Sequence, residues 1–439
     1  MLYRRPQTHA MLNVDNFVEG KIPFHIFVIV MDDSLGGAGG EPSSGTVRRQ
    51  SPANAVLPAI NILFTTTYPT AVMNPLHALL EQGQSIWYDF ISRDFISSGE
   101  MKRLVDQGLR GMTSNPTIFE KAIAGGNAYD EQIREIGAGP SIAEIATRIF
   151  ITDIRNACDV MRTVYDNSNG TDGFISIEVN PKLAAKTEET IAEARSLWKE
   201  VGRPNVMIKI PATPEGIPAV RQCISEGINV NITLMFSLEQ YRAVAGAYLN
   251  GLEDRVANGG EINGINSVAS VFVSRIDTMI DEMLGAIGTP DALALRGKAG
   301  LANSKLVYEE FKRTFSGERW EKLAERGAHP QRPLWASTSS KNPNYPDLLY
   351  VDNLIGPMTV NTVPPETLAA IMDHAVVRAT IEEGVDEARE AMRKLADVGI
   401  DIDAVMKKLI AEGVSKFEKS FDTLFQKLEE KHGALVAAE

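Results

Sequence analysis

The sequence NVMIKIPAT, residues 205–213, places one lysine, Lys209, among four apolar residues and ends its apolar run at Pro211. An apolar run of this length, closed by proline and followed by helical spacing, is typical of a buried strand in an α/β protein. Burying an ammonium group is costly unless it is paired, and loss of its proton leaves a nucleophilic amine. Such an amine can attack a carbonyl group and form a Schiff base. The alternative is an ammonium that reaches solvent at the strand end or pairs with a carboxylate.

The composition is that of an ordinary soluble globular protein, with 44% hydrophobic and 23% charged residues in a chain of 439. This length fits one large domain or two to three ordinary ones. No apolar run reaches the roughly 18 residues that a membrane span needs. The formal net charge of −13 provides no basic field for nucleic acid or acidic lipid, so any phosphate-bearing ligand must be bound by local cations.

The cysteines and histidines do not form metal-binding or disulfide patterns. Cys158 and Cys223 have no CxxC partner, which argues against a disulfide framework or zinc site and favours a reducing compartment. The six histidines show no HxxxH or HxH spacing, so we expect no metal site.

Residues 1–72 differ in composition and hydrophobic pattern from the rest of the chain. They contain the Gly/Ser/Pro tract SLGGAGGEPSSG at 34–45, typical of a flexible linker, and an apolar run at 22–31 that is too short to span a bilayer. We therefore expect a boundary near Met73, with 1–72 forming either a disordered extension or an upstream translation-start artefact. The domain proper is expected to be 73–439.

From Met73 onward, short apolar runs alternate with longer helical patterns, as in βα units of a parallel sheet. Two long helical patterns, 365–395 and 402–431, close the chain. We predict a (β/α)8 TIM barrel with additional C-terminal helices rather than an open doubly wound sheet, since no GxGxxG follows any strand. The eight predicted strands are 86–91, 111–114, 173–179, 206–210, 230–236, 265–273, 334–337 and one within 349–363.

Polar residues occur near the ends of successive predicted strands, where the catalytic groups of such a barrel converge. Strand alternation puts Asn231 and Thr233 on one side of their strand. Two carboxylates, one amine and several amides or hydroxyls suit carbonyl chemistry with proton transfer. The residues are Asp89, Asn115, Glu178, Lys209, Asn231, Thr233 and Ser270.

Each of these residues also has a structural interpretation. Asp89 could cap a helix, Glu178 could merely pair with Lys209, Asn115 could be a turn residue, and Thr233 could be a strand former. Their occurrence on consecutive strands of one barrel favours the functional interpretation over coincidence.

Four long segments resemble transaldolase, specifically its longer bacterial form. They are GMTSNPTIFEKAI at 111–123, NVMIKIPAT with the following PEGIPAV, INVNITLMFS at 228–237 and SVASVFVSRID at 267–277. The resemblance covers the chain from Met73 to its C-terminus and does not extend to residues 1–72.

The resemblance implies a class I aldolase-type barrel that moves a dihydroxyacetone unit from sedoheptulose 7-phosphate to glyceraldehyde 3-phosphate, giving erythrose 4-phosphate and fructose 6-phosphate. It implies that Lys209 forms the Schiff base and that Asp89 takes the proton from the sugar hydroxyl as the C–C bond breaks. Glu178 would act as acid and base through a water held with Thr233. The residues implied to hold the dihydroxyacetone unit are Asn115, Asn231 and Ser270, with Phe272 as an aromatic wall.

The resemblance also implies where the phosphate binds. Arg275, five residues past Ser270, matches the family's first phosphate-binding arginine and opens a helix whose dipole favours an anion. In place of a second arginine motif, the chain has LWASTSSKNP at 334–343. There Ser337, Ser340 or Lys341 could contact phosphate, and a lysine would supply a point charge without the arginine fork.

We thus expect a cytoplasmic enzyme of the non-oxidative pentose phosphate pathway with phosphorylated sugar substrates, no cofactor, no metal, and no nucleic-acid or membrane partner. One alternative is a fructose 6-phosphate aldolase, which releases free dihydroxyacetone. Another is a sugar-phosphate-binding regulatory protein without catalysis. The oligomeric state stays open, a homo-oligomer included.

Overall fold

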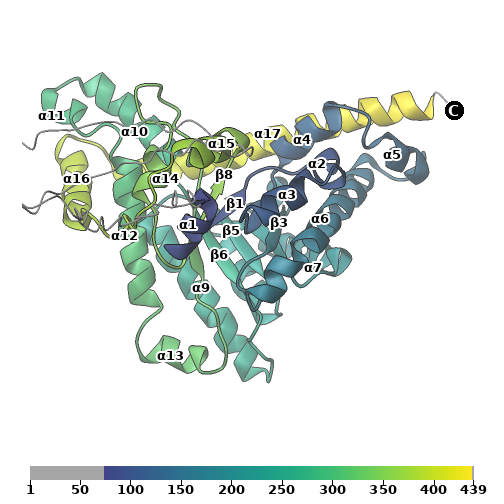
Figure 1. Cartoon of the computed structure of the whole chain (residues 1–439), viewed down its shortest axis with the longest axis horizontal. Helices are drawn as coiled ribbons and strands as arrows, with labels where there is room; N and C mark the ends of the chain where they lie inside the picture. The colour runs from purple at the N-terminus through teal and green to yellow at the C-terminus, as the bar shows by residue number, and fades with distance from the viewer. Residues whose placement is uncertain (1–73, 438–439) are drawn as a thin grey trace, which may run out of the picture. The chain divides into compact units, whose positions relative to one another are not determined.

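The computed structural model describes residues 74–437, so the expectations for residues 1–72 lie outside the described part. Within it, eight parallel strands pair in sequence order and close into a barrel (Figure 1), which confirms the predicted (β/α)8 fold. The strands are β1 (Gln84–Tyr88), β2 (Gly111–Thr113), β3 (Phe174–Glu178), β4 (Val206–Pro211), β5 (Val230–Met235), β6 (Ser267–Phe272), β7 (Arg332–Ala336) and β8 (Thr359–Val363).

The helices lie between and after these strands. In chain order they are α1 (Pro75–Glu81), α2 (Arg93–Ser97), α3 (Glu100–Asp106), α4 (Pro116–Ala124), α5 (Asp130–Ile136), α6 (Ile142–Asn167), η1 (Pro181–Leu183), α7 (Thr187–Val201), α8 (Gly216–Ser225), α9 (Leu238–Ala257), α10 (Ser274–Ile287), α11 (Pro290–Leu293), α12 (Ala299–Thr314), α13 (Glu318–Ala324), α14 (Leu349–Asn353), α15 (Pro365–His374), α16 (Val385–Asp397) and α17 (Ile402–Val436).

The expectation of one helical pattern over 365–395 is wrong, because the chain leaves the helical conformation between α15 and α16. There Thr380 donates its backbone N–H to the Ile355 carbonyl at 2.8 Å and its hydroxyl to the Asp352 carbonyl at 2.8 Å. Gly384 then adopts a φ of 64°, which glycine tolerates, as the residue before α16. The polar groups of Thr380 therefore bond to α14 and to the segment between α14 and β8, and they do not take part in a continuous helix.

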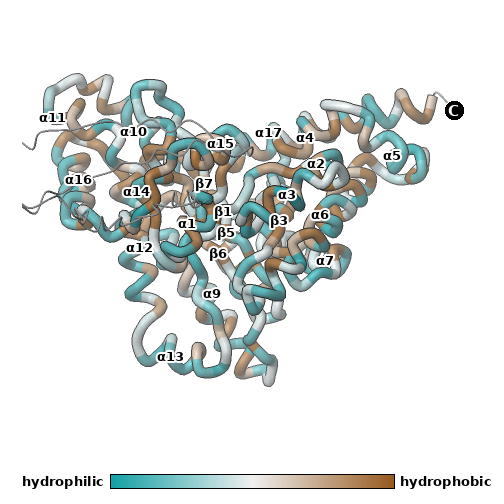
Figure 2. Tube along the Cα trace, in the orientation of Figure 1, coloured by the Kyte–Doolittle hydropathy of each residue, from teal (hydrophilic) through white to brown (hydrophobic). Residues whose placement is uncertain are grey.

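Amphipathic helices cover the barrel. In α6, buried Ile145, Ile149 and Ile154 recur at helical spacing, and the tube of α6 in Figure 2 shows hydrophobic and hydrophilic stretches in turn. The strands are buried along nearly their whole length, as expected of strands enclosed by helices. Among residues 74–437, no helix is long and apolar enough to cross a membrane.

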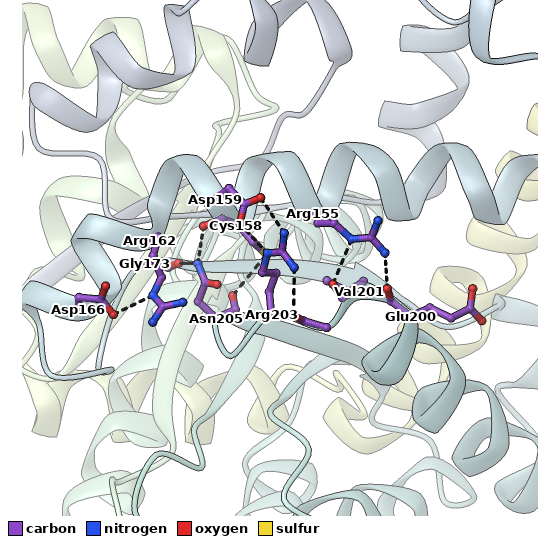
Figure 3. Close-up of polar contacts among 11 residues, drawn as sticks. Arg155, Cys158, Asp159, Arg162, Asp166, Gly173, Glu200, Val201, Arg203 and Asn205 are labelled. Carbon is purple, nitrogen blue, oxygen red and sulfur yellow. Dashed lines mark hydrogen bonds and ion pairs between the residues drawn. The ribbon is translucent and has the colours of Figure 1, made fainter.

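A buried asparagine anchors the start of the strand that carries Lys209. Asn205 Nδ2 donates to the carbonyl oxygens of Cys158 on α6 and Gly173 before β3, each at 2.9 Å (Figure 3). These two bonds fix where β4 begins, and the β3–β4 register then pairs Glu178 with Lys209.

The C-terminal helix α17 packs on elements that follow the carboxyl ends of several strands. It contacts α4, η1 and α10, which follow β2, β3 and β6, and it also contacts β5. A hydrogen bond of 2.8 Å joins Thr117 on α4 to Ser420 on α17, and Lys427 pairs with Glu120 at 2.6 Å. Helix α17 thus lies against the carboxyl end of the barrel strands.

Candidate active site

A cavity of about 180 Å³ opens at the carboxyl ends of the strands. Eight of the ten residues predicted from the sequence line it, and the other two, Glu178 and Asn231, contact lining residues. The eight are Asp89, Asn115, Lys209, Thr233, Ser270, Phe272, Arg275 and Lys341. The barrel therefore brings these ten residues together, from strands β3 to β6 and from the segments that follow β1, β2, β6 and β7.

Lys209 sits at the centre of this set and is only 5% exposed. Its Nζ donates to the carbonyl oxygen of Ser114 at 3.0 Å and lies 3.6 Å from Glu178 Oε2. Glu178 is thus the carboxylate partner expected if Lys209 is only a paired structural residue. Its presence is equally compatible with a Schiff-base lysine, because a neighbouring carboxylate can also take a proton from the amine.

Two carboxyl groups flank the lysine, and burial raises the pKa of each. For Asp89, the charge of Lys209 and a 2.6 Å hydrogen bond from Thr113 Oγ1 oppose that rise in pKa. Thr113 in turn shares a 2.7 Å hydrogen bond with Thr362 on β8. For Glu178, the pKa is raised by burial and the charge of Lys209 opposes the rise. Carboxyl groups with raised pKa values are suited to proton transfer near neutral pH.

A chain of hydrogen-bonded polar side chains joins β6, β5 and β3 next to the lysine, where Asn231 pairs in register with Lys209. Ser270 Oγ donates to Asn231 Oδ1 at 2.7 Å, and Asn231 Nδ2 donates to Ser176 Oγ at 2.9 Å. Ser270 therefore keeps oxygen lone pairs that can accept from a ligand hydroxyl. Asn115 caps α4 by accepting from Ile118 N at 3.1 Å, which leaves its side-chain amide nitrogen as a donor beside the cavity.

Two buried oxygens near Lys209 have no hydrogen-bond partner among the described residues, Glu178 Oε2 and Thr233 Oγ1. Thr233 precedes an irregularity of β5, where the pairing register with β6 shifts and Leu234 has a φ of 55°. Bulges of this kind re-aim side chains and occur often beside active sites.

One side of the cavity is cationic. Arg275, in the first turn of α10, has its guanidinium carbon 4.9 Å from the Phe272 ring centroid and 6.0 Å from that of Phe417 on α17. Lys341 Nζ donates to Ser339 Oγ at 2.5 Å. Ser337 and Ser339 line the cavity.

Sequence reasoning left three residues after β7 as alternatives for phosphate contact, and it missed several neighbours of the site. Ser340 does not line the cavity, since its hydroxyl donates to the backbone oxygen of Asn342 at 3.1 Å. Thr113 and Thr362 were missed although they lie at strand ends, where a search for hydroxyl groups beside Asp89 would have found them. Phe417 carries no local signal, because its position depends on how α17 packs.

A second cavity, of about 110 Å³, lies at the opposite end of the barrel, where strands β3, β4, β6 and β7 begin. Beside it, Arg332 pairs with Asp172 at 3.1 Å, and Ser85 donates to the same carboxylate at 2.5 Å. Such a closed polar network at the amino-terminal end of a barrel contributes to stability rather than catalysis. Within residues 74–437, no group of three or more His, Cys, Asp or Glu side chains is arranged to hold a metal ion.

Comparisons with known proteins agree with this geometry. The family described as transaldolase/fructose-6-phosphate aldolase matches residues 86–428. A transaldolase from Parafrankia sp. is 49% identical over 366 residues, which cover 83% of this chain and 99% of that protein. A protein named transaldolase 2 from Nostoc sp. is 50% identical over 372 residues, or 82% of this chain and 98% of its own length. A transaldolase from Thermobifida fusca is 48% identical over 364 residues, 82% of this chain and 99% of that protein. This chain is a member of the transaldolase/fructose-6-phosphate aldolase family.

Proposed function

We propose that this chain is a transaldolase that uses Lys209 as its Schiff-base nucleophile. The reaction moves a dihydroxyacetone unit from sedoheptulose 7-phosphate to glyceraldehyde 3-phosphate and gives erythrose 4-phosphate and fructose 6-phosphate. The observation that carries the proposal is a buried amine, 3.6 Å from the Glu178 carboxylate, in a cavity that also contains Asp89.

The first chemical step is attack of Lys209 Nζ on the ketose carbonyl carbon. Glu178 takes the proton that the amine must lose and returns a proton to the carbinolamine hydroxyl, which leaves as water. Its unpartnered Oε2 and the unpartnered hydroxyl of Thr233 are available to hold a water molecule for these transfers. The product is an iminium ion on Lys209.

The second step breaks the bond between C3 and C4 of the ketose. Asp89 accepts the proton of the C4 hydroxyl, the C3–C4 electron pair moves into the iminium to form an enamine, and the aldehyde departs. Addition of the enamine to the second aldehyde, with Asp89 returning the proton, and then hydrolysis complete the transfer. Between the two halves, Asn115, Asn231 and Ser270 hold the three-carbon unit, which keeps it from leaving early.

Arg275 and Lys341 are proposed to bind the phosphate group. Arg275 offers a planar fork that suits phosphate, and its place in the first turn of α10 adds the favourable helix dipole. Lys341 adds a point charge from the segment after β7.

The experiment that tests the proposal combines trapping with a coupled assay. Borohydride reduction with fructose 6-phosphate should leave an adduct that peptide mapping places on Lys209, and no adduct there would refute the mechanism. With erythrose 4-phosphate present, transfer should dominate. Release of free dihydroxyacetone without transfer would favour the fructose 6-phosphate aldolase alternative.

A cytoplasmic location in the non-oxidative pentose phosphate pathway is part of the same proposal. Two features support it: the phosphorylated substrates, and two buried cysteines, Cys158 and Cys223, that form no disulfide. A regulatory protein without catalysis is disfavoured, because a binding pocket has no need of a buried amine between two carboxyl groups.

A further inference from the structure

One face of the C-terminal helix α17 packs against the carboxyl end of the barrel strands, and Lys416 lies at the exposed edge of that face. At Gly413 the approach is so close that an added Cβ atom would lie 3.6 Å from Arg275 Nη1. At Ser420 the hydroxyl accepts the hydrogen bond from Thr117. Lys416 is three residues after Gly413 and four before Ser420, and helix residues at these spacings lie side by side.

The neighbour of Lys416 in sequence already belongs to the cavity. Phe417 lines it, and the Arg275 guanidinium lies 6.0 Å from the Phe417 ring. The electrostatics place the Lys416 ammonium in the same region. The pKa of Lys416 is lowered, first by the charge of Arg275, then by partial burial, then by the charge of Lys341. Arg275 and Lys341 therefore line the cavity, and Lys416 lies near enough for both of their charges to act on it.

These three cations have no acidic partner in the described part of the chain. None of the ion pairs within 4 Å among residues 74–437 involves Arg275, Lys341 or Lys416. By contrast, Lys427 and Lys431 on the same helix are paired, at 2.6 Å each, with Glu120 and Asp130. The carboxylates of Asp89 and Glu178 act on Arg275 from beyond 4 Å and offset its charge only in part. An anion bound among the three cations would relieve their mutual repulsion.

We infer that Lys416 is a third cation of the substrate's phosphate site, so that the C-terminal helix takes part in substrate recognition. The inference rests on the proposed function, because it assigns Lys416 to the phosphate group of that same substrate. Lys416 is exposed and is not itself a cavity-lining residue, so we expect it to act on the capture of the phosphate rather than on bond breaking. Its loss should change the KM for phosphorylated sugars and leave kcat nearly unchanged.

The test compares Lys416→Gln with Lys419→Gln, a matched loss of one positive charge on the same helix. Like Lys416, Lys419 is exposed, forms no ion pair within 4 Å among residues 74–437, and is not a cavity-lining residue, so the two lysines differ in their position along α17. Lys416→Arg, which keeps the charge, serves as a rescue variant. The affinity for inorganic phosphate is measured by calorimetry on the full chain, and KM and kcat for fructose 6-phosphate are measured with erythrose 4-phosphate as acceptor.

Lys416→Gln should weaken phosphate binding and raise the KM by about three- to tenfold, as expected for one partly screened charge–phosphate contact. Lys416→Arg should restore both values, and Lys419→Gln should match the wild type. Equal phosphate affinity in the two glutamine variants would overturn the inference, as would a wild-type protein that binds no phosphate. If phosphate binding depends on Lys416 but borohydride traps no adduct on Lys209, the proposed function fails while the anion site stands.

Discussion

Replacing Glu178 by glutamine separates the proton-transfer role of this side chain from a structural one. Glutamine keeps the shape of glutamate but cannot exchange a proton at working pH. Glu178 is the only carboxylate within 4 Å of Lys209 Nζ among residues 74–437, at 3.6 Å, and burial raises its pKa. The variant thus removes the base that is placed to deprotonate the amine.

The structure allows the size of the effect to be estimated. A positioned acid or base contributes about 10²- to 10⁴-fold to rate, so we expect kcat for Glu178→Gln to fall within that range. Removing one partner of a buried ion pair costs up to about 3–5 kcal/mol of stability. Because Lys209 Nζ keeps its hydrogen bond to the Ser114 carbonyl, we expect a folded protein with a lower urea midpoint.

The assay follows adduct formation by quenching fructose 6-phosphate mixtures with borohydride at increasing times. In Glu178→Gln the adduct on Lys209 should form more slowly by the same factor as kcat. The matched control is Glu193→Gln, because Glu193 also has a raised pKa from burial but accepts from the Asn180 backbone N–H at 2.9 Å, outside the cavity. A Glu178→Gln enzyme whose kcat is within tenfold of the control would refute the shuttle role.

Three further predictions concern individual side chains. Lys209→Ala should fold, because deleting a buried amine relieves its desolvation, and it should show no turnover and no borohydride adduct; a chain that fails to fold by circular dichroism would instead support the structural interpretation. Thr113→Val removes the hydrogen bond that lowers the pKa of Asp89, so the acidic limb of the kcat/KM profile should move to higher pH, and an unmoved limb would argue against Asp89 as the base. Burial raises the pKa of Asp277 to about 6, above its unfolded value of 3.8, so its proton stabilises the fold as pH falls from about 6 towards 4. In Asp277→Asn the gain in unfolding free energy between pH 7 and pH 4 should be about 2 kcal/mol smaller than in the wild type, as measured by urea denaturation; identical gains in the two proteins would contradict the raised pKa.

The barrel could be predicted from the sequence because buried parallel strands are short apolar runs. All eight predicted runs contain a strand of the barrel. A helix such as α12 is harder to recognise from the sequence. That helix buries Asn303, Ser304 and Glu310, so its polar residues do not mark a solvent face. Asn303 donates to the Phe236 carbonyl at 2.7 Å, and Glu310 pairs with Arg242 at 3.1 Å. Tertiary partners thus override the periodicity that sequence reasoning depends on.

The candidate site was predictable where its residues lie on strands, since the barrel alone brings strand ends together. It was not predictable where residues depend on the docking of a distant helix. Phe417 and Lys416 follow β6 by more than a hundred residues, and only the seating of α17 brings them to Arg275.

The packing of α17 also involves the carboxyl end of β5. An added Cβ at Gly413 would lie 2.8 Å from Leu234 Cδ2, so the absence of a side chain at Gly413 lets the helix reach the strand. Leu234 is the residue that departs from regular strand geometry, with a φ of 55°, directly after Thr233. A left-handed leucine is unfavourable by itself and persists only where its surroundings hold it. The helix that carries Lys416 therefore also packs on the irregularity beside Thr233, and if the two proposed roles hold, this packing contact links phosphate binding to proton transfer in the cavity.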